Sequence, residues 1–147
     1  MPPERPTIET YPYITPITTR WMDNDIYGHI NNVAYYSFFD SAANRFLIER
    51  GGLDIANASV IGLVVESKCT YHAALTYPQP IRAGVRVDKL GHRAVTYGIA
   101  IFSDDDPRAA AHGYFVHVFV DRTTRTPTPI PESIRAALAS IAVEVAP

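Results

Sequence analysis

The sequence predicts an α+β domain in which one antiparallel sheet packs against a single long helix. Three observations predict this fold class. One segment shows helical spacing of its polar residues, four later segments are rich in β-branched and aromatic residues, and short turn sequences separate those segments. Consecutive strands joined by short turns favour antiparallel pairing. The length of 147 residues fits one domain.

The first residues predict an irregular arm followed by a strand. We place the arm at residues 1–13 because of its prolines, and the domain at residues 14–147. Residues 14–21 predict the first strand, since threonine and isoleucine favour extended backbone. Pro16 suits an edge strand or a strand start, because proline lacks the N–H that a central strand would use.

The one long helix is predicted from Val33 onward. There, polar residues recur every three or four positions in a segment that is otherwise apolar and aromatic, so we expect the helix to be largely buried. Asn31 or Asn32 can cap its start with a side-chain oxygen, and the pair Gly51-Gly52 can end it in a left-handed conformation.

Four strands and a short helix should follow. The strands are predicted at residues 60–71, 81–89, 94–102 and 110–121, separated by turn sequences at 77–80, 90–92 and 103–107. Near the end of the chain, Ile134, Leu138 and Ile141 lie on one face of a helix predicted over 132–142.

Charge and composition narrow the function. A formal net charge of -2 argues against a partner bound through the phosphates of nucleic acid. No apolar run approaches the ~20 residues that span a bilayer, and the first residues lack a secretory signal. The single cysteine, Cys69, excludes a disulfide within the chain and a two-cysteine zinc site. We therefore expect a cytoplasmic protein without nucleic-acid or membrane partners.

The polar segment before the helix carries the clearest motif. Residues 20–35 are RWMDNDIYGHINNVAY. This segment resembles the pattern R-x-x-D-x-D-x-x-G-H-x-N-N-x-x-Y of 4-hydroxybenzoyl-CoA thioesterase-like acyl-CoA thioesterases, which have the hotdog fold, an antiparallel sheet curled around a central helix. The similarity continues through residues 39–42, 67–75 and 129–132. The proline-rich first dozen residues have no family counterpart, and Ala74-Leu75 stands where a proline is common.

The resemblance implies hydrolysis of a thioester between coenzyme A and a carboxylic acid. It implies a site shared between two subunits, and therefore a homodimer or a dimer of dimers. It implies no metal or redox cofactor, because coenzyme A is part of the substrate.

Thioester hydrolysis needs a group that attacks the thioester or deprotonates water, and donors aimed at the oxyanion. The family's loop aspartate aligns with Asp25, as general base or nucleophile. Backbone N–H groups at the start of the following helix would polarise the carbonyl. The structural alternative is that Asp25 only bonds nearby backbone N–H groups, as many loop aspartates do.

The neighbours of Asp25 each allow two interpretations. His29 can orient the water or hold the carboxylate, or it can simply bond the backbone. Asn31 and Asn32 can brace the loop and cap the helix, and an amide there can also touch the acyl carbonyl. Gly28 permits close approach of the substrate or an unusual backbone conformation. Tyr27 beside it belongs to the same candidate binding set.

Two more carboxylates, Asp40 and Asp23, also need an assigned role. Asp40 is the rival for the catalytic role, because other hotdog thioesterases place the working carboxylate on the central helix. We expect Asp40 to lie at that depth among aromatic side chains, while its structural interpretation is a polar stripe that includes Asn44. Asp23 is expected to be structural and to pair with Arg20.

Candidate substrate contacts lie on the helix and on the strands. Tyr35 could line an acyl tunnel, although an aromatic residue on a buried helix is also a core residue. Arg82 and Arg93 could bind the phosphates of coenzyme A, since guanidinium groups bind phosphate bidentately, or they could form part of a solvated surface.

Two other functions stay open at this point. A hotdog dehydratase or hydratase would pair a histidine base with a helix carboxylate, which His29 and Asp40 could imitate, although the residues after His29 do not match the expected pattern. A non-catalytic acyl-CoA binding module would keep the fold and lose the chemistry. The presence of both Asp25 and Asp40 argues against that module.

Overall fold

A computed structural model of the chain describes residues 4–143. The strands of this part are β1 (Tyr13–Ile17), β2 (Val60–Tyr71), β3 (Ile81–Leu90), β4 (Ala94–Ser103) and β5 (Ala111–Asp121). The helices are α1 (Asn32–Gly51) and α2 (Glu132–Ser140), and two short 3-10 turns span Ile8–Thr10 and Trp21–Asp23. No helix of the described residues is long and apolar enough to cross a bilayer.

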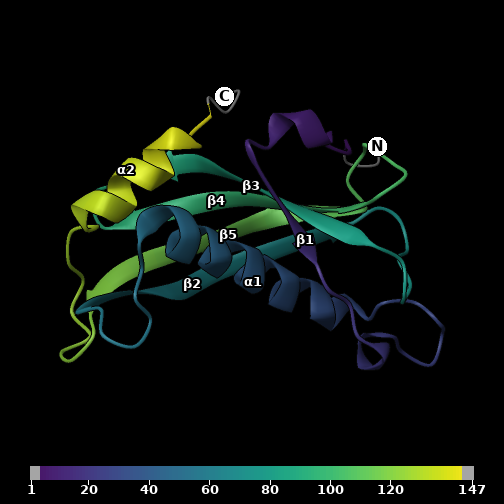
Figure 1. Cartoon of the computed structure of the whole chain (residues 1–147), viewed down its shortest axis with the longest axis horizontal. Helices are drawn as coiled ribbons and strands as arrows, with labels where there is room; N and C mark the ends of the chain where they lie inside the picture. The colour runs from purple at the N-terminus through teal and green to yellow at the C-terminus, as the bar shows by residue number, and fades with distance from the viewer. Residues whose placement is uncertain (1–3, 144–147) are drawn as a thin grey trace.

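The five strands form one antiparallel sheet in the order β1-β3-β4-β5-β2. Although β2 and β3 are consecutive in sequence, they are not neighbours, because residues 72–80 carry the chain from one edge of the sheet toward the other. Helix α1 lies across one face of the sheet, and α2 covers its C-terminal end (Figure 1). This arrangement confirms the predicted α+β class and the hotdog fold.

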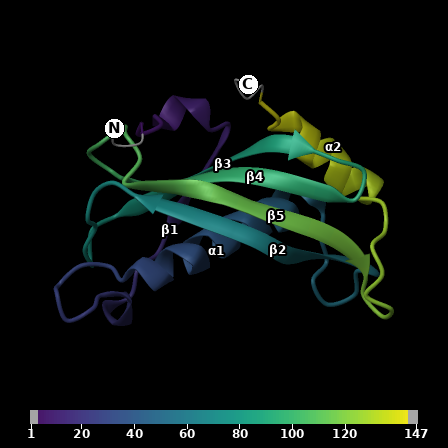
Figure 2. The ribbon, with the colours of Figure 1, turned by 180° about the vertical axis from the view of Figure 1, so that it is seen from behind.

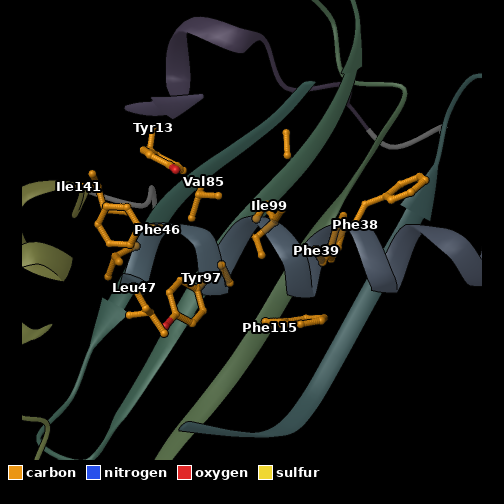
Figure 3. Close-up of a cluster of buried hydrophobic side chains, with 14 of the residues drawn as sticks. Tyr13, Phe38, Phe39, Phe46, Leu47, Val85, Tyr97, Ile99, Phe115 and Ile141 are labelled. Atoms are coloured by element: carbon orange, nitrogen blue, oxygen red, sulfur yellow. The ribbon is translucent and has the colours of Figure 1, made fainter. Parts of the chain in front are cut away.

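The core lies between α1 and the sheet. Figure 3 shows Phe38, Phe39, Phe46 and Leu47 of α1 projecting from the helix among side chains of β3, β4 and β5. Phe39 meets Phe115 edge to face, with ring centroids 5.8 Å apart. Such an aromatic pair adds to the burial of apolar area that stabilises the fold.

The opposite side of α1 is exposed. Val33 is 71% exposed, Tyr36 37% and Ile48 43%. The expectation of a largely buried helix is therefore wrong for this side. Apolar residues all round a helix predict burial on every side, yet only the side toward the sheet is covered in this chain.

Both ends of α1 are capped as predicted. The side chain of Asn31 accepts a hydrogen bond from the N–H of Val33, and Gly52 closes the helix with φ 70°. Gly51 is buried against Ile134 and Ala137 of α2. The second helix therefore packs directly on the C-terminal turn of the first.

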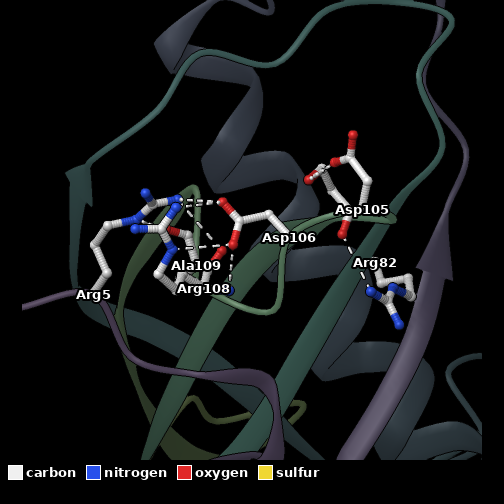
Figure 4. Close-up of polar contacts among 7 residues, drawn as sticks. Arg5, Arg82, Asp105, Asp106, Arg108 and Ala109 are labelled. Atoms are coloured by element: carbon white, nitrogen blue, oxygen red, sulfur yellow. Dashed lines mark hydrogen bonds and ion pairs between the residues drawn. The ribbon is translucent and has the colours of Figure 1, made fainter.

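The N-terminal arm is less irregular than predicted. Residues 1–3 lie outside the described part, but the rest of the arm docks on the face of the sheet opposite α1, where Tyr11 is buried against Phe102. Arg5 donates to the carbonyl of Ala109 at 2.9 Å and pairs with Asp106 at 3.3 Å (Figure 4). The first strand is also shorter than predicted, because it ends at Ile17, which pairs with the first residue of β3, Ile81.

The two edges of the sheet differ in length. β1 has five residues, whereas β2 has 12. Figure 2 shows β2 along one edge of the sheet with no further strand beside it. A register shift between Val64 and Glu66 marks a bulge in this strand, where Val65 is 61% exposed.

Candidate active site

Residues 23–31 form a closed loop at the N-terminal end of α1. The N–H of Asp25 donates to the carbonyl of His29 at 2.9 Å, and the N–H of Gly28 donates to the carbonyl of Asp25 at 3.1 Å. Gly28 has φ 83°, a left-handed conformation that strains any residue with a Cβ. The glycine of the motif is therefore required by the turn itself.

A second segment braces this loop. Three hydrogen bonds join the loop to residues 75–77: Ile30 N–H to Leu75 O at 2.8 Å, Thr76 Oγ1 to Gly28 O at 2.8 Å, and Tyr77 N–H to Asn24 Oδ1 at 3.1 Å. Each of these polar groups would otherwise have to be satisfied by water. The loop therefore has a defined shape although its tip, with Ile26, Tyr27 and His29, is exposed.

Asp23 is part of the frame of the loop. It is 5% exposed and accepts from Arg20 twice, from the backbone N–H at 2.8 Å and from the guanidinium at 3.1 Å. The predicted pairing of Asp23 with Arg20 is confirmed.

The Asp25 carboxylate is only partly used by the protein. Its Oδ1 accepts from the N–H of Tyr27 at 2.9 Å, as in an ordinary loop aspartate. Among the described residues, neither an ion pair nor a second hydrogen bond engages the carboxylate. One oxygen of this partly buried carboxylate is therefore free to accept a proton or to attack.

The start of α1 offers fewer free amides than expected. Asn31 accepts from the N–H of Val33 with its side chain and from the N–H of Ala34 with its carbonyl, both at 2.9 Å. The backbone N–H of Asn32 has no protein partner within residues 4–143. The expected group of free amides thus narrows to one donor at the positive end of the helix dipole.

A cavity of about 350 Å³ lies between this helix start and the end of β2. It is lined by His29, Ile30, Asn32, Tyr35, Tyr71, His72, Ala73 and Ala74. Tyr71 and Tyr35 meet edge to face at 5.1 Å, and the Tyr71 hydroxyl donates to the carbonyl of Asn32 at 3.0 Å. Burial raises the pKa of Tyr35 to about 12, so the ring stays neutral. The cavity combines an aromatic wall with two imidazoles and the free helix amide.

The structure brings part of the predicted set together. His29, Asn32 and Tyr35 line the cavity, whereas Asp25 is not among the lining residues and is linked to them by its backbone bond to His29. Tyr27 is 79% exposed beside Gly28 at the tip of the loop. The side chain of Asn31 is occupied as the helix cap.

Two lining residues, Tyr71 and His72, were not predicted as site residues. Both fall inside residues 67–75, where the similarity to the thioesterases continues, so a signal for them was present. They lie about 40 positions from the loop motif in sequence, and only the end of β2 brings them beside it.

Asp40 does not occupy the predicted environment. Its side chain is exposed and accepts from the side-chain amide of Asn44 at 3.0 Å. It lies two turns into α1 and is absent from the residues that line the cavity with His29. The expected shielding among aromatic residues is wrong, and the structure does not bring the dehydratase pair His29–Asp40 together.

Arg82 and Arg93 also lie apart. Arg82 is the second residue of β3 and donates to the carbonyl of Ser103 at 3.2 Å (Figure 4). Arg93 is exposed in the turn after β3, about 25 Å away at the usual rise of a strand. Across residues 4–143, no group of three or more His, Cys, Asp or Glu side chains is arranged to hold a metal ion.

Comparison with known proteins places the chain. A family model described as the thioesterase-like superfamily matches residues 19–138. The crystal structure of the PA5185 protein from Pseudomonas aeruginosa is 53% identical, with a TM-score of 0.93 over 95% of this chain and 97% of that one. The PA2801 protein of the same organism is 28% identical, with a TM-score of 0.79 over 85% and 96% of the two chains.

A more distant structure shares the fold. BH1999 gentisyl-coenzyme A thioesterase is 21% identical, with a TM-score of 0.76 over 86% of this chain and 99% of that one. The search of curated proteins gave no match. The family match, the topology and the loop motif agree, and the chain belongs to the thioesterase-like superfamily of hotdog proteins.

Proposed function

We propose that the protein is an acyl-CoA thioesterase, releasing free coenzyme A and a carboxylic acid. The observation that carries this proposal is the closed loop at the N-terminus of α1, in which Asp25 keeps one carboxylate oxygen free and His29, bonded to the Asp25 backbone, lines the cavity. Membership of the thioesterase-like superfamily makes thioester hydrolysis the expected chemistry.

Asp25 is the proposed catalytic carboxylate. As a general base it takes a proton from water, which attacks the carbonyl carbon; as a nucleophile it forms an anhydride that water then cleaves. In both routes the C–S bond breaks and the thiolate of coenzyme A takes up a proton. The Asn32 N–H and the helix dipole stabilise the negative charge on the carbonyl oxygen. His29 lies where it can orient the water.

The cavity is the proposed site of the acyl group next to the thioester. Tyr35 supplies part of its aromatic wall, and Ile30 adds apolar surface. Tyr27 and Gly28 at the loop tip are proposed to contact the coenzyme A side. Arg82 follows the segment that braces the loop and is the better placed arginine for a phosphate. Arg93, at the other end of β3, would serve a different part of the substrate.

We propose a homodimer formed through β2. This strand is the long edge of the sheet, and its exposed Val64 (45%) and Val65 (61%) favour a second copy as the cover. Because Tyr71 at the end of β2 lines the cavity, a partner paired along β2 would lie next to the site. Sedimentation should give a dimer or a dimer of dimers for the wild type, and Val65→Lys should shift it toward monomer. A monomeric wild type would refute this assembly.

The experiment that tests the function is release of free thiol from short, long, branched and aromatic acyl-CoAs by the purified protein. Hydrolysis of at least one class is the expected result, and the preferred class names the substrate. If none of the acyl-CoAs is hydrolysed while coenzyme A binding is still measurable, the protein is a non-catalytic binding module.

A further inference from the structure

His72 and His112 form a hydrogen-bonded pair behind the candidate active site. His72 follows the last residue of β2, and His112 is the second residue of β5. Nε2 of His72 lies 2.7 Å from Nδ1 of His112, and the ring planes differ by 4°. A separation of 2.7 Å is too short for face-to-face contact, and the ring centroids are 4.9 Å apart, so the rings lie edge to edge and one ring donates a hydrogen bond to the other.

The pair connects two cavities. His72 lines the active-site cavity, together with His29 and Asn32. His112 lines a second cavity, of about 320 Å³, beneath the N-terminal arm. The backbone N–H of His72 donates to the carbonyl of Ala110 at 2.8 Å, which fixes the base of the side chain to the start of β5. His72 is therefore held by hydrogen bonds at both its backbone and its ring.

Only one ring nitrogen of His72 is left for a ligand. Nε2 is used by His112, and Nδ1 has no protein partner within the described residues. In the neutral pair, one ring donates this hydrogen bond and the other accepts it. The tautomer of His112 therefore decides whether Nδ1 of His72 is a donor or an acceptor. A histidine whose second nitrogen is fixed by a partner is the usual arrangement of an imidazole that works on a substrate.

Burial and the nearby positive charges favour the neutral form of both rings. Burial first, and then Arg5 on the arm, lowers the pKa of His72. Burial, His72, Arg86 of β3 and Lys68 of β2 lower the pKa of His112. Glu4 lines the same cavity as His112, while Asp106 is engaged by Arg5 and Arg108 (Figure 4). The titratable residues that face the same cavity as His72 are His29, Tyr35 and Tyr71.

We propose that His72 contacts the substrate in the active-site cavity through Nδ1, and that His112 is the positioning residue that orients it. This inference rests on the proposed thioesterase function. It adds a residue from the end of β2 to a site otherwise built from the loop and α1. The contact is a hydrogen bond to the thioester group or to the water held against it, with no proton transfer required.

Substitutions by glutamine and asparagine separate the substrate contact of His72 from the positioning role of His112. In His72→Gln, the amide can still reach His112 from the position of Nε2, but Nδ1 is lost. In His112→Asn, an amide atom replaces Nδ1 and can still bond His72, whereas His112→Ala removes the bond. The matched control is His92→Gln, because His92 is exposed in the turn between β3 and β4 and its side chain makes no hydrogen bond in the described structure.

The measurements are kcat and KM on the best acyl-CoA, a pH profile of kcat/KM and a thermal melt. We expect kcat/KM to fall about tenfold in His72→Gln and in His112→Ala, the size of one lost hydrogen bond in the transition state. His112→Asn and His92→Gln should stay within about twofold of the wild type. An acid limb below the ordinary histidine pKa of about 6.5 should be present in the wild type and absent in His72→Gln.

Two results would overturn the assignment. One is wild-type kcat/KM and an unchanged pH profile in His72→Gln. The other is a loss in His112→Asn as large as in His112→Ala, accompanied by lower melting temperatures, which would make the pair purely structural. If His112→Ala does not fold, His72→Gln and its pH profile still decide the question. A wild type that hydrolyses none of the panel refutes the proposed function itself, which is a separate result.

Discussion

The two ends of α1 are built in different ways. At the N-terminal end, Ile26 is 93% exposed and Tyr27 79%, and the loop keeps its shape through hydrogen bonds to residues 75–77. At the C-terminal end, Phe46 and Leu47 are 0% and 1% exposed, and α2 packs over the last turn. At the N-terminal end an exposed loop tip is held by hydrogen bonds and only Ile30 of the loop reaches the core, whereas the C-terminal end is buried in the core under α2.

This difference between the two ends predicts which substitutions affect function and which affect stability. Buried apolar area is the main favourable contribution to folding, whereas binding residues usually lie on loops held by a rigid scaffold. We therefore expect changes at the N-terminal end to alter catalysis with little effect on the free energy of unfolding. Changes at the C-terminal end should do the reverse.

The largest expected effect is that of Asp25→Asn on catalysis. The asparagine can still accept from the N–H of Tyr27, so the loop should keep its shape, but it can neither take a proton nor attack. We expect kcat/KM to fall at least about 100-fold, with an unchanged urea midpoint. Asp104→Asn, the same change in an exposed turn, is the control. If Asp25→Asn lost as much stability as a core substitution at the C-terminal end, the distinction between the two ends would not hold.

Phe46→Ala should show the opposite behaviour. Phe46 is fully buried and meets Tyr13 edge to face at 5.0 Å, so its truncation leaves a cavity in the core. We expect a loss of about 3–5 kcal/mol in the free energy of unfolding, measured by urea denaturation. At a temperature where the variant is folded, its kcat/KM should stay near the wild-type value. A large loss of kcat/KM in the folded variant would couple the two ends.

Acid should weaken the core through His117. Burial lowers the pKa of His117 from 6.5 to about 4, and its Nδ1 lies 3.1 Å from the hydroxyl of the buried Tyr97. As the pH falls from 6.5 to 4, the unfolded chain takes up the proton first, so folding becomes less favourable by about 3 kcal/mol. Above 6.5 both states are neutral and below 4 both are protonated, so the stability changes with pH only inside that window, and the full loss persists at lower pH.

Urea unfolding of wild type and His117→Gln across this window measures the effect. The glutamine keeps a partner for Tyr97 and does not titrate, so its stability should depend less on pH by that amount. Parallel curves for the two proteins would assign the acid sensitivity to other groups.

The smallest effect concerns two glycines, one near each end of α1. Gly28 has φ 83° and Gly52 has φ 70°, and a Cβ would meet no atom within 4 Å at either position. Alanine should therefore cost about 1 kcal/mol of stability in both cases, from backbone strain alone. Only Gly28→Ala should also change kcat/KM. An equal kinetic change in Gly52→Ala would show that strain anywhere on α1 reaches the site.

Local structure followed from the sequence because its signals are local. The observed β2 begins and ends at the predicted residues, since a run of β-branched residues lies between a polar turn and an Ala-rich one. The Asn31 cap and the Gly52 stop were also predicted, because each depends on bonds to residues a few positions away. The Asp23–Arg20 pair belongs to the same class.

Long-range choices could not be predicted in the same way. The position of β2 at the sheet edge is decided by its pairing with β5, and Tyr11 is buried because the arm crosses β3 and β4 on the face away from α1. Asp40 was expected in an aromatic environment, yet its side of the helix faces solvent. For the candidate site, the loop motif identified one wall, whereas the His72 wall depends on the strand order.

The most direct test compares Asp25→Asn with Asp40→Asn in one thiol-release assay, on the acyl-CoA that the wild type prefers. The two substitutions remove the same charge from opposite candidates, one in the braced loop and one on the exposed side of α1. A site at the N-terminal end of α1 predicts collapse of hydrolysis in Asp25→Asn and near wild-type rates in Asp40→Asn. Collapse in Asp40→Asn with hydrolysis retained in Asp25→Asn would contradict the account and move the chemistry to the helix.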